Sequence, residues 1–238
     1  TSRISEEQLL QQIDSLNKNP EIDGILVQLP LPTHINPTII TIGISPEKDV
    51  DGLHPINLGK LSLEHDTTGF VPCTPLGIKV LLEKYNIDTG GKHAVIVGRS
   101  TIVGKPMASL LLQKEKYGNA TVTIAHGQSK NLCEICQQAD ILISAVGKPL
   151  LIKEEMVKSG AIVIDVGINR ISDLSKTSGH KLVGDVDYKN VKKKCSYITP
   201  VPGGVGPMTI AMLMNNTIKS FCRRESIKKA VKCPDIFY

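Results

Sequence analysis

The sequence predicts an α/β protein whose C-terminal part is a doubly wound parallel sheet, preceded by a smaller α/β lobe. After residue 92, aliphatic runs of strand length alternate with segments of helical periodicity, which is typical of right-handed βαβ units. A glycine-containing turn directly follows the first run, where the chain would pass from strand to helix. The aliphatic runs are HAVIV at 93–97, TVTIA at 121–125, DILISAV at 140–146 and AIVIDV at 161–166.

Helices are expected between these runs, near 103–116, 131–138 and 153–158. A further short strand at 197–199 is expected to lead through Pro-Val-Pro-Gly-Gly into a helix at 207–221. Because consecutive parallel strands need such crossovers, the helices should cover both faces of the sheet.

The N-terminal lobe begins with a predicted helix over 5–17. Ser5 and Gln8 have the spacing of a capping box, and the apolar residues that follow have helical spacing. ILVQL at 25–29 is a short apolar run ending at a proline, which favours a buried strand. A second helix is expected over 75–85, before the pair Gly90-Gly91. The helical apolar positions of the first segment are Leu9, Leu10, Ile13 and Leu16.

These patterns predict three parts. Residues 1–89 form the N-terminal lobe, 90–205 the parallel-sheet domain, and 206–238 a C-terminal helix returning to the first lobe, with a basic tail. A chain of 238 residues, 41% hydrophobic and 21% charged, can bury a core of this size without disulfides.

Composition excludes several classes of protein. No stretch approaches the roughly 18 uncharged apolar residues of a membrane helix, and the first residues do not resemble a secretory signal. With no Trp, 3 Phe and 5 Tyr, the chain lacks the aromatic residues on which nucleic-acid bases stack. We therefore expect neither a membrane nor a nucleic acid as partner.

The net charge of +5 is concentrated at the C-terminus, between Lys219 and Lys232. A basic patch can bind a membrane surface or a nucleic acid, but a solvated helix face and tail is the favoured interpretation. The six cysteines suggest a reducing compartment. Cys133 and Cys136 form a C-x-x-C pair without a second pair, so we expect reduced cysteines and no metal site.

The turn Gly98-Arg-Ser-Thr-Ile-Val-Gly104 follows a predicted strand and opens a helix. Backbone N–H groups at such a helix start can bind a pyrophosphate, although a plain tight turn would also need glycine here. The second strand ends at Ala125-His126-Gly127, without the acidic residue that holds the ribose hydroxyls of NAD. Arg99 can instead bind a 2′-phosphate, so NADP is the favoured cofactor and NAD remains possible.

Two other segments are rich in features that a core does not need. Gly-Gly-Val-Gly at 203–206, framed by prolines, can lie flat against a ligand or form a tight crossover. Asp49 and Asp51 are two residues apart and should point to the same side if this segment is extended. An Asx turn is an equally good interpretation of the two carboxylates.

Taken together, several motifs resemble one family, the bifunctional methylenetetrahydrofolate dehydrogenases and methenyltetrahydrofolate cyclohydrolases. The resemblance extends from Ser5 to Thr217, in order and in register. The motifs are VQLPLP, KDVDG, PCTP, GRSTIVGKPM, NATVTIAH, AIVIDVGIN, GDVDY and TPVPGGVGPMTIAML.

The resemblance implies a folate-facing N-terminal lobe and a Rossmann-like NADP-binding domain, with the active site in the cleft between them. By this resemblance, Gln28 assists hydrolysis and Asp51 binds the pterin ring, and both are assigned as catalytic. The substrate-binding residues would be Val27, Gln28, Leu29, Asp51, Pro202, Gly203, Gly204, Val205 and Gly206. The cofactor-binding residues would be Gly98, Arg99, Ser100 and Ile168.

Two departures from the family pattern qualify these expectations. The family's cyclohydrolase lysine lies in a Tyr-x-x-x-Lys segment upstream of these motifs, and the folate lobe is incomplete without it. Nothing argues that Lys48 or Lys60 replaces it. The chain is therefore expected to be a fragment, or to belong to a dehydrogenase-only or non-catalytic remnant. Gly127 replaces a serine that binds the 2′-phosphate, leaving Arg99 and Lys105 to select NADP.

A dehydrogenase of shikimate or amino-acid type on a similar two-lobed fold is a further alternative, but it leaves VQLPLP and PVPGGVGPMT unexplained. The resemblance also implies a homodimer through the Rossmann-like domain. The compartment, cytoplasm or mitochondrial matrix, is left open.

Overall fold

The computed structural model describes residues 4–63, 68–173, 175 and 179–225. The chain forms two compact units, which are described separately. Unit 1 comprises Thr1–Cys73 and Ala211–Tyr238, and unit 2 comprises Thr74–Ile210. The functional division expected at 89/90 and 205/206 stays a prediction. Within the described ranges, no helix is long and apolar enough to cross a membrane.

Unit 2 contains the parallel sheet that the sequence predicts. Its strands lie in the order β2-β1-β3-β4-β7 and all pair in parallel. Val97 pairs with Ala125 and with Ser144, and Ser144 pairs with Asp165, so four strands end at one edge. The strands are β1 (His93–Val97), β2 (Thr121–Ala125), β3 (Ile141–Ser144), β4 (Ile162–Asp165) and β7 (Tyr197–Ile198).

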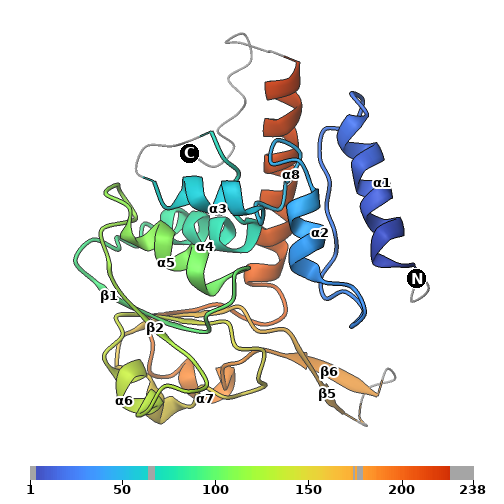
Figure 1. Ribbon diagram of the computed structural model, residues 1–238. Coiled ribbons are helices and arrows are strands. Elements are labelled where there is room, and N and C mark those ends of the chain that lie inside the picture. Colours follow the sequence, from blue (N-terminus) through green and yellow to red (C-terminus); the bar gives the residue numbers. More distant parts are fainter. Residues whose placement is uncertain (1–3, 64–67, 174, 176–178, 226–238) are drawn as a thin grey trace. The chain divides into compact units, whose positions relative to one another are not determined.

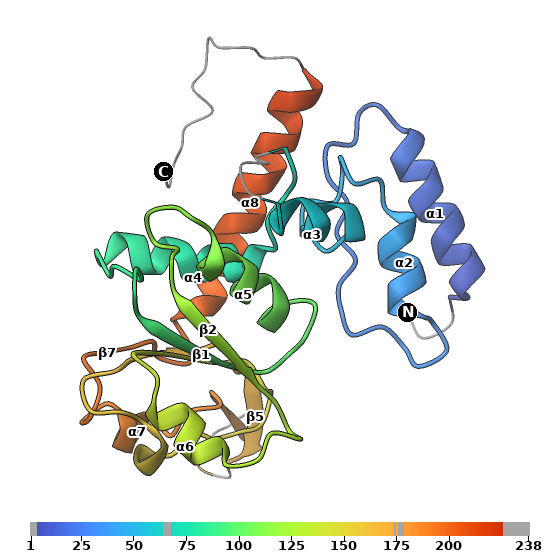
Figure 2. The same cartoon turned by 60° about the vertical axis from the view of Figure 1, so that its left-hand side comes forward.

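Helices lie on both faces of this sheet, as expected (Figure 1, Figure 2). α4 (Cys73–Lys84) and α5 (Gly104–Leu112) are on one face, and α6 (Leu132–Gln137) and α7 (Tyr188–Val191) are on the other. The prediction of a helix at 153–158 is wrong, because only a single 3-10 turn, η1 (Glu154–Met156), forms there. The backbone is already extended at Val157, and Gly160 follows in a left-handed conformation, so no room is left for a second turn.

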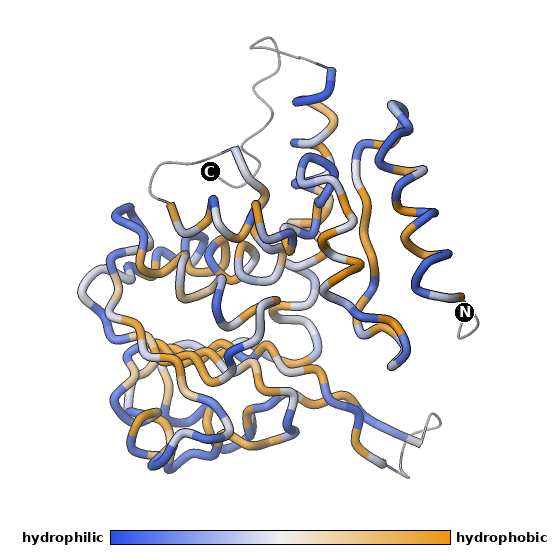
Figure 3. Tube along the Cα trace, in the orientation of Figure 1, coloured by the Kyte–Doolittle hydropathy of each residue, from blue (hydrophilic) through white to orange (hydrophobic). Residues whose placement is uncertain are grey.

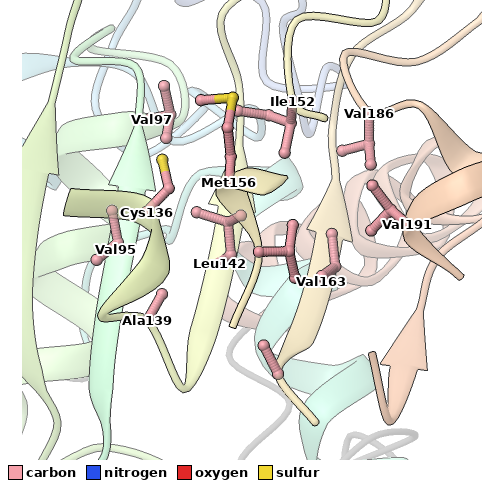
Figure 4. Packing of buried hydrophobic residues seen from close by; sticks show 12 residues of the cluster. Val95, Val97, Cys136, Ala139, Leu142, Ile152, Met156, Val163, Val186 and Val191 are labelled. Carbon is pink, nitrogen blue, oxygen red and sulfur yellow. The ribbon is translucent and has the colours of Figure 1, made fainter. Parts of the chain in front are cut away.

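The core of unit 2 is aliphatic and lies against the strands (Figure 4). Figure 3 shows the central strands as the most hydrophobic stretch of the unit, as expected for a sheet covered on both faces. Cys136 belongs to this core, and burial raises the pKa of its thiol to about 12. The buried cluster on the α6 side comprises Val95, Val97, Cys136, Ala139, Leu142, Ile152, Met156, Val157, Ala161, Val163, Val186 and Val191.

An antiparallel hairpin also belongs to unit 2 and was not anticipated from the sequence. Its strands are β5 (Asn169–Ser172) and β6 (His180–Val183). Both strands are short and largely exposed, so they lack the aliphatic runs by which the other strands are recognised.

Unit 1 is built from helices around a small isoleucine core. α1 (Glu6–Lys18) begins with the predicted capping box: Gln8 N–H donates to Ser5 Oγ at 3.1 Å, and Ser5 N–H to Gln8 Oε1 at 3.0 Å. α2 (Pro37–Gly43) and α3 (Pro55–Leu61) each begin with proline, whose missing N–H costs nothing there. α1 and α2 lie side by side (Figure 1, Figure 2). The core comprises Ile13, Ile25, Ile35, Ile40 and Ile44.

The strand predicted at 25–29 is wrong, since only Ile25 forms a bridge, with Asp49. Ile25 N–H donates to the carbonyl of Lys48 at 2.7 Å, but the 46–51 segment turns away directly. Gly52 N–H bonds back to Asp49, so Asp49 and Asp51 lie on a turn and not on the extended segment that we considered. A ladder needs a partner at successive residues, and a turn offers only one.

The long C-terminal helix α8 (Val205–Arg224) was predicted at 207–221, and from Ala211 on it belongs to unit 1. Its basic end is not simply solvated. Arg224 Nε lies 2.6 Å from Asp23, and the Arg223 guanidinium lies 4.7 Å from the centre of the Phe70 ring. Lys219 Nζ donates to the carbonyl of Gly69 at 3.4 Å. The rest of the predicted basic tail lies outside the described residues.

Candidate functional site

The turn after β1 requires glycine at two positions. Gly98 has a φ of +128°, and a Cβ there would overlap the carbonyl of Ala145. A Cβ at Gly104 would overlap the carbonyl of Gly98. The two glycines, both buried, therefore let the start of α5 pack closely against the end of β1.

Ser100 and Arg99 are both exposed on this turn. The Ser100 hydroxyl accepts hydrogen bonds from Val103 N–H at 3.0 Å and Gly104 N–H at 3.4 Å. These contacts use its lone pairs at the start of α5 but leave its own proton free to be donated. Ser100 can thus stabilise the helix and donate to a phosphate oxygen at once.

Arg99 lies beside His126, at the end of β2, with Nη1 3.4 Å from Nε2. The other ring nitrogen, Nδ1, accepts from Gln128 N–H at 3.2 Å. A neutral imidazole has only one acceptor nitrogen, so Nε2 carries the proton and does not accept a strong bond from Arg99. The guanidinium is thus only weakly held and can turn toward an anion. Gly127, with open space where a side chain would be, adds no further group.

Two buried aspartates that we did not identify from the sequence organise the same edge of the sheet. Asp165, the last residue of β4, accepts hydrogen bonds from the N–H groups of Gly167, Asp185 and Val186 at 2.9–3.0 Å. Burial raises the pKa of Asp165 to about 6, although these three hydrogen bonds act in the opposite direction.

The Asp185 carboxylate connects the loops that follow β3 and β4. It accepts from Val146 N–H at 2.7 Å, Gly147 N–H at 3.1 Å and Asn169 Nδ2 at 2.9 Å. The signal that could have revealed these two residues is an acidic side chain at the end of an otherwise aliphatic run, together with the acids of GDVDY.

Ile168 follows this network on the loop after β4, and 64% of its surface is exposed. Its side chain leaves an apolar surface at the strand ends. Its Cδ1 lies 3.9 Å from the position that a Cβ on Gly206 would occupy. Ile168 and Gly206, both predicted site residues, are therefore neighbours within unit 2.

The segment that carries Pro202, Gly203, Gly204 and Val205 borders a cavity of about 270 Å³. Pro202 and Gly203 are exposed, whereas Val205 is buried. Of the predicted residues, only Gly203 and Gly204 line the cavity. Its wall comprises Leu81, Leu82, Tyr85, Ile87, Ile164, Tyr197, Ile198, Thr199, Pro200, Gly203, Gly204, Pro207 and Met208.

In unit 1, the predicted residues of VQLPLP are accessible. Gln28 is exposed, and its Nε2 donates to the carbonyl of Leu29 at 3.0 Å. Val27 and Leu29 are half-buried. Because the amide nitrogen makes this contact, the carboxamide oxygen of Gln28 points away from it and is available to another group.

The two carboxylates of KDVDG have different surroundings. Asp49 is buried and accepts from His54 N–H at 2.7 Å and from Asn57 Nδ2 at 2.8 Å, so it stabilises the turn. Asp51 is only half-buried, and its pKa is raised by burial. Lys48 Nζ donates to the carbonyls of Leu16, Asn17 and Asn19 at the end of α1, which gives this lysine a structural task.

Two family models match the chain. The tetrahydrofolate dehydrogenase/cyclohydrolase catalytic domain matches residues 1–51, and the NAD(P)-binding domain of the same family matches residues 72–225. The "Bifunctional protein FolD" of Protochlamydia amoebophila is 58% identical over 224 residues, which are 94% of this chain and 76% of that protein.

Solved structures agree with these matches. The bifunctional FolD enzyme of Campylobacter jejuni is similar with a TM-score of 0.86 and 53% identity, over 94% of this chain and 75% of that one. The Trypanosoma brucei dehydrogenase-cyclohydrolase, solved with NADP cofactor and an inhibitor, has a TM-score of 0.88 and 40% identity. It matches 95% of this chain and 75% of its own.

Proposed function

Because this chain belongs to the tetrahydrofolate dehydrogenase/cyclohydrolase family, we propose that it serves NADP-dependent folate chemistry. 5,10-Methylenetetrahydrofolate is oxidised to the 5,10-methenyl cation. Water then adds to the cationic carbon, a ring C–N bond opens, and 10-formyltetrahydrofolate and a proton are formed. Membership of this family also excludes the alternative dehydrogenase of shikimate or amino-acid type. The observation that carries the proposal is the joint presence of the folate-lobe and nucleotide-domain motifs in one chain.

The residues after β1 fit the phosphates of NADP. Arg99 is exposed and weakly held, Ser100 is exposed and has a free hydroxyl proton, and the close packing at Gly98 fixes the turn that carries both. NADP, when bound, accepts the hydride on its nicotinamide ring. The exposed apolar surface of Ile168 would support that ring, so unit 2 contributes positioning and not proton transfer.

In unit 1, the roles proposed for Asp51 and Gln28 follow from their chemistry. An ionised Asp51 accepts hydrogen bonds from the N–H groups at the edge of a pterin, and these orient the ring. The Gln28 carboxamide can orient water and polarise the methenyl carbon, but it does not take up a proton at neutral pH. A different group must therefore accept the proton of hydrolysis, the part that the family resemblance gives to an upstream lysine.

The test measures two activities of the natural gene product. Cofactor reduction is followed with methylenetetrahydrofolate and either NADP or NAD, and hydrolysis is followed as loss of the methenyl compound. Turnover of both kinds by the natural product is expected. Reduction without hydrolysis would favour the dehydrogenase-only alternative, and no reduction with either cofactor would contradict the proposal.

Gln28→Ala tests the hydrolytic role separately. We expect it to slow hydrolysis at least tenfold while cofactor reduction changes much less, since orientation of water matters only in the second step. Gln12→Ala, at an exposed position of α1, is the matched control and should leave both rates unchanged. Equal losses of both activities in the Gln28 variant would argue against this role.

We further propose a homodimer formed through the nucleotide-binding domain, and a location in the cytoplasm or mitochondrial matrix. The family resemblance supports the dimer, and sedimentation equilibrium should give twice the mass of one chain. A monomer at micromolar concentration would contradict it. Imaging of the tagged natural gene product would distinguish the two compartments.

A further inference from the structure

Asp51 lies against a second segment of unit 1, residues 71–73. Cys73 N–H donates to the carbonyl of Asp51 at 3.3 Å. Gly52, with a φ of +75°, has no room for a Cβ, which would lie 2.6 Å from the carbonyl carbon of Val71. The two segments therefore meet backbone to backbone, and this brings the Asp51 and Cys73 side chains together.

A buried asparagine of α8 holds both segments. Asn216 is 2% exposed, and its Nδ2 donates to the carbonyls of Val50 at 2.9 Å and Val71 at 3.1 Å. The same nitrogen lies 3.6 Å from Cys73 Sγ. One carboxamide thus fixes the chain just before Asp51 and just before Cys73, and it also approaches the sulfur.

The thiol of Cys73 acts as a hydrogen-bond donor in this cluster. It donates to the carbonyl of Val50, the residue before Asp51, at 3.4 Å. Burial, followed by the negative charge of Asp51, raises the pKa of the thiol far above neutrality, so it keeps its proton. Asn216 Nδ2, 3.6 Å from the sulfur, is itself a donor and cannot accept this proton, so the S–H proton is directed toward oxygen.

We propose that Cys73 and Asn216 are positioning residues for Asp51. Both side chains donate to the carbonyl of Val50, and Cys73 N–H donates to the carbonyl of Asp51, so together they set the direction in which Asp51 meets its ligand. This inference rests on the proposed function, in which Asp51 binds the pterin. It assigns the cysteine of PCTP a task that needs a protonated thiol and no redox chemistry.

The cluster also controls the ionisation of Asp51. Burial raises the pKa of Asp51, the Cys73 hydrogen bond lowers it, and the charge of Asp49 on the same turn raises it again. From α8, the cluster is faced by the uncharged Asn216. Loss of the thiol therefore removes the interaction that favours the carboxylate and raises the pKa of Asp51 further.

The experiment uses the natural gene product at saturating NADP and measures KM for methylenetetrahydrofolate between pH 5 and 8. Cys73→Ala should raise this KM roughly three- to tenfold, the effect expected for loss of one hydrogen bond. The rise of KM on the acid side of the pH profile should begin at a higher pH than in the wild type. KM for NADP should not change. Cys73→Ser keeps a donor and should restore the folate KM and the pH profile. Cys222→Ala, at a half-buried cysteine of α8, is the matched control.

Asp51→Asn separates the two proposals. If it leaves the folate KM unchanged, the role of Asp51 fails. If it raises the folate KM but Cys73→Ala has wild-type KM and pH profile, only the positioning role is overturned. An equal rise of both KM values in Cys73→Ala also overturns it. Should Cys73→Ala lack a cooperative unfolding transition, Cys73→Val, which fills the volume without a donor, takes its place with the same expected results.

Discussion

Buried carboxylates at the strand ends of unit 2 hold the loops that would surround a cofactor. Asp165 and Asp185 are 3% and 0% exposed, and between them they accept hydrogen bonds from five backbone N–H groups. Two neighbouring carboxylates in a protein core are unfavourable unless such donors compensate them. The loops after β3 and β4 are therefore fixed by side chains that do not themselves reach the surface.

Asp165 makes stability depend on pH with a sign opposite to that of most carboxylates. Its pKa is about 6 in the folded protein and 3.8 as the ordinary value, so the folded state binds more protons between these limits. The free energy of unfolding therefore falls as pH rises from about 4 to about 6, by on the order of 2–3 kcal/mol. Urea unfolding of the wild type and Asp165→Asn at pH 4, 5, 6 and 7 should show this slope only in the wild type. Parallel profiles would contradict the prediction.

Arg99 is the residue proposed to bind the 2′-phosphate of NADP, and its substitution tests that role. Arg99→Ala should raise KM for NADP about ten- to a hundredfold, the effect of losing a charged hydrogen bond of roughly 1.5–3 kcal/mol. KM for NAD should stay nearly unchanged, because NAD has no 2′-phosphate. Steady-state kinetics with both cofactors measure this, and Arg170→Ala, at an exposed arginine of the hairpin, is the control. Unchanged NADP kinetics would refute the phosphate role.

At the scale of elements, local signals succeed where an element is stabilised from within. The capping box of α1 and the aliphatic strands of the sheet are confirmed, since their residues contact near neighbours or a continuous core. The run at 25–29 has the composition of a strand but forms one bridge, because its neighbour is a turn. The hairpin of β5 and β6 shows the converse, a pair of strands without a hydrophobic signal.

The cap of α1 can be tested with two serines of the same region. Ser5→Ala removes the acceptor for Gln8 N–H and should lower the free energy of unfolding by about 1 kcal/mol. Ser15→Ala, at an exposed position inside the helix, should be neutral or slightly stabilising, because alanine has the higher helix propensity. Denaturant titrations of the two variants, run in parallel with the wild type, measure both changes in the free energy of unfolding. Equal effects would mean that the capping box contributes nothing.

At the scale of the whole molecule, unit 1 is assembled from the two ends of the chain. The second part of α8 returns to it, and Ser220, 5% exposed, donates to the carbonyl of Asp23 at 2.5 Å and lies 3.0 Å from that of Glu47. Arg224 adds an ion pair with Asp23. These contacts join residues about two hundred positions apart, so the stability of unit 1 depends on the last helix.

Ser220→Ala should therefore destabilise the protein by about 1–3 kcal/mol, because the partly buried carbonyl of Asp23 loses its donor. The control is Thr217→Ala, whose hydroxyl donates within its own helix, to the carbonyl of Leu213 at 2.8 Å. Its effect should stay within about 0.5 kcal/mol. Thermal and urea unfolding give both values. A Ser220 variant as stable as the control would show that the return of α8 is held by other contacts.

The parallel sheet, the order of its elements and the family could be predicted from the sequence, because they depend on periodicity and on motifs that are contiguous in the chain. The roles of Gln28, Asp51, Arg99 and the other predicted site residues stay predictions. Only the tertiary structure decided that Asp49 is structural while Asp51 is accessible, and that a thiol and a carboxamide adjoin Asp51. The side chains around Asp51 join positions 23 to 166 residues apart, and burial and hydrogen bonding between such distant positions leave no periodic signal.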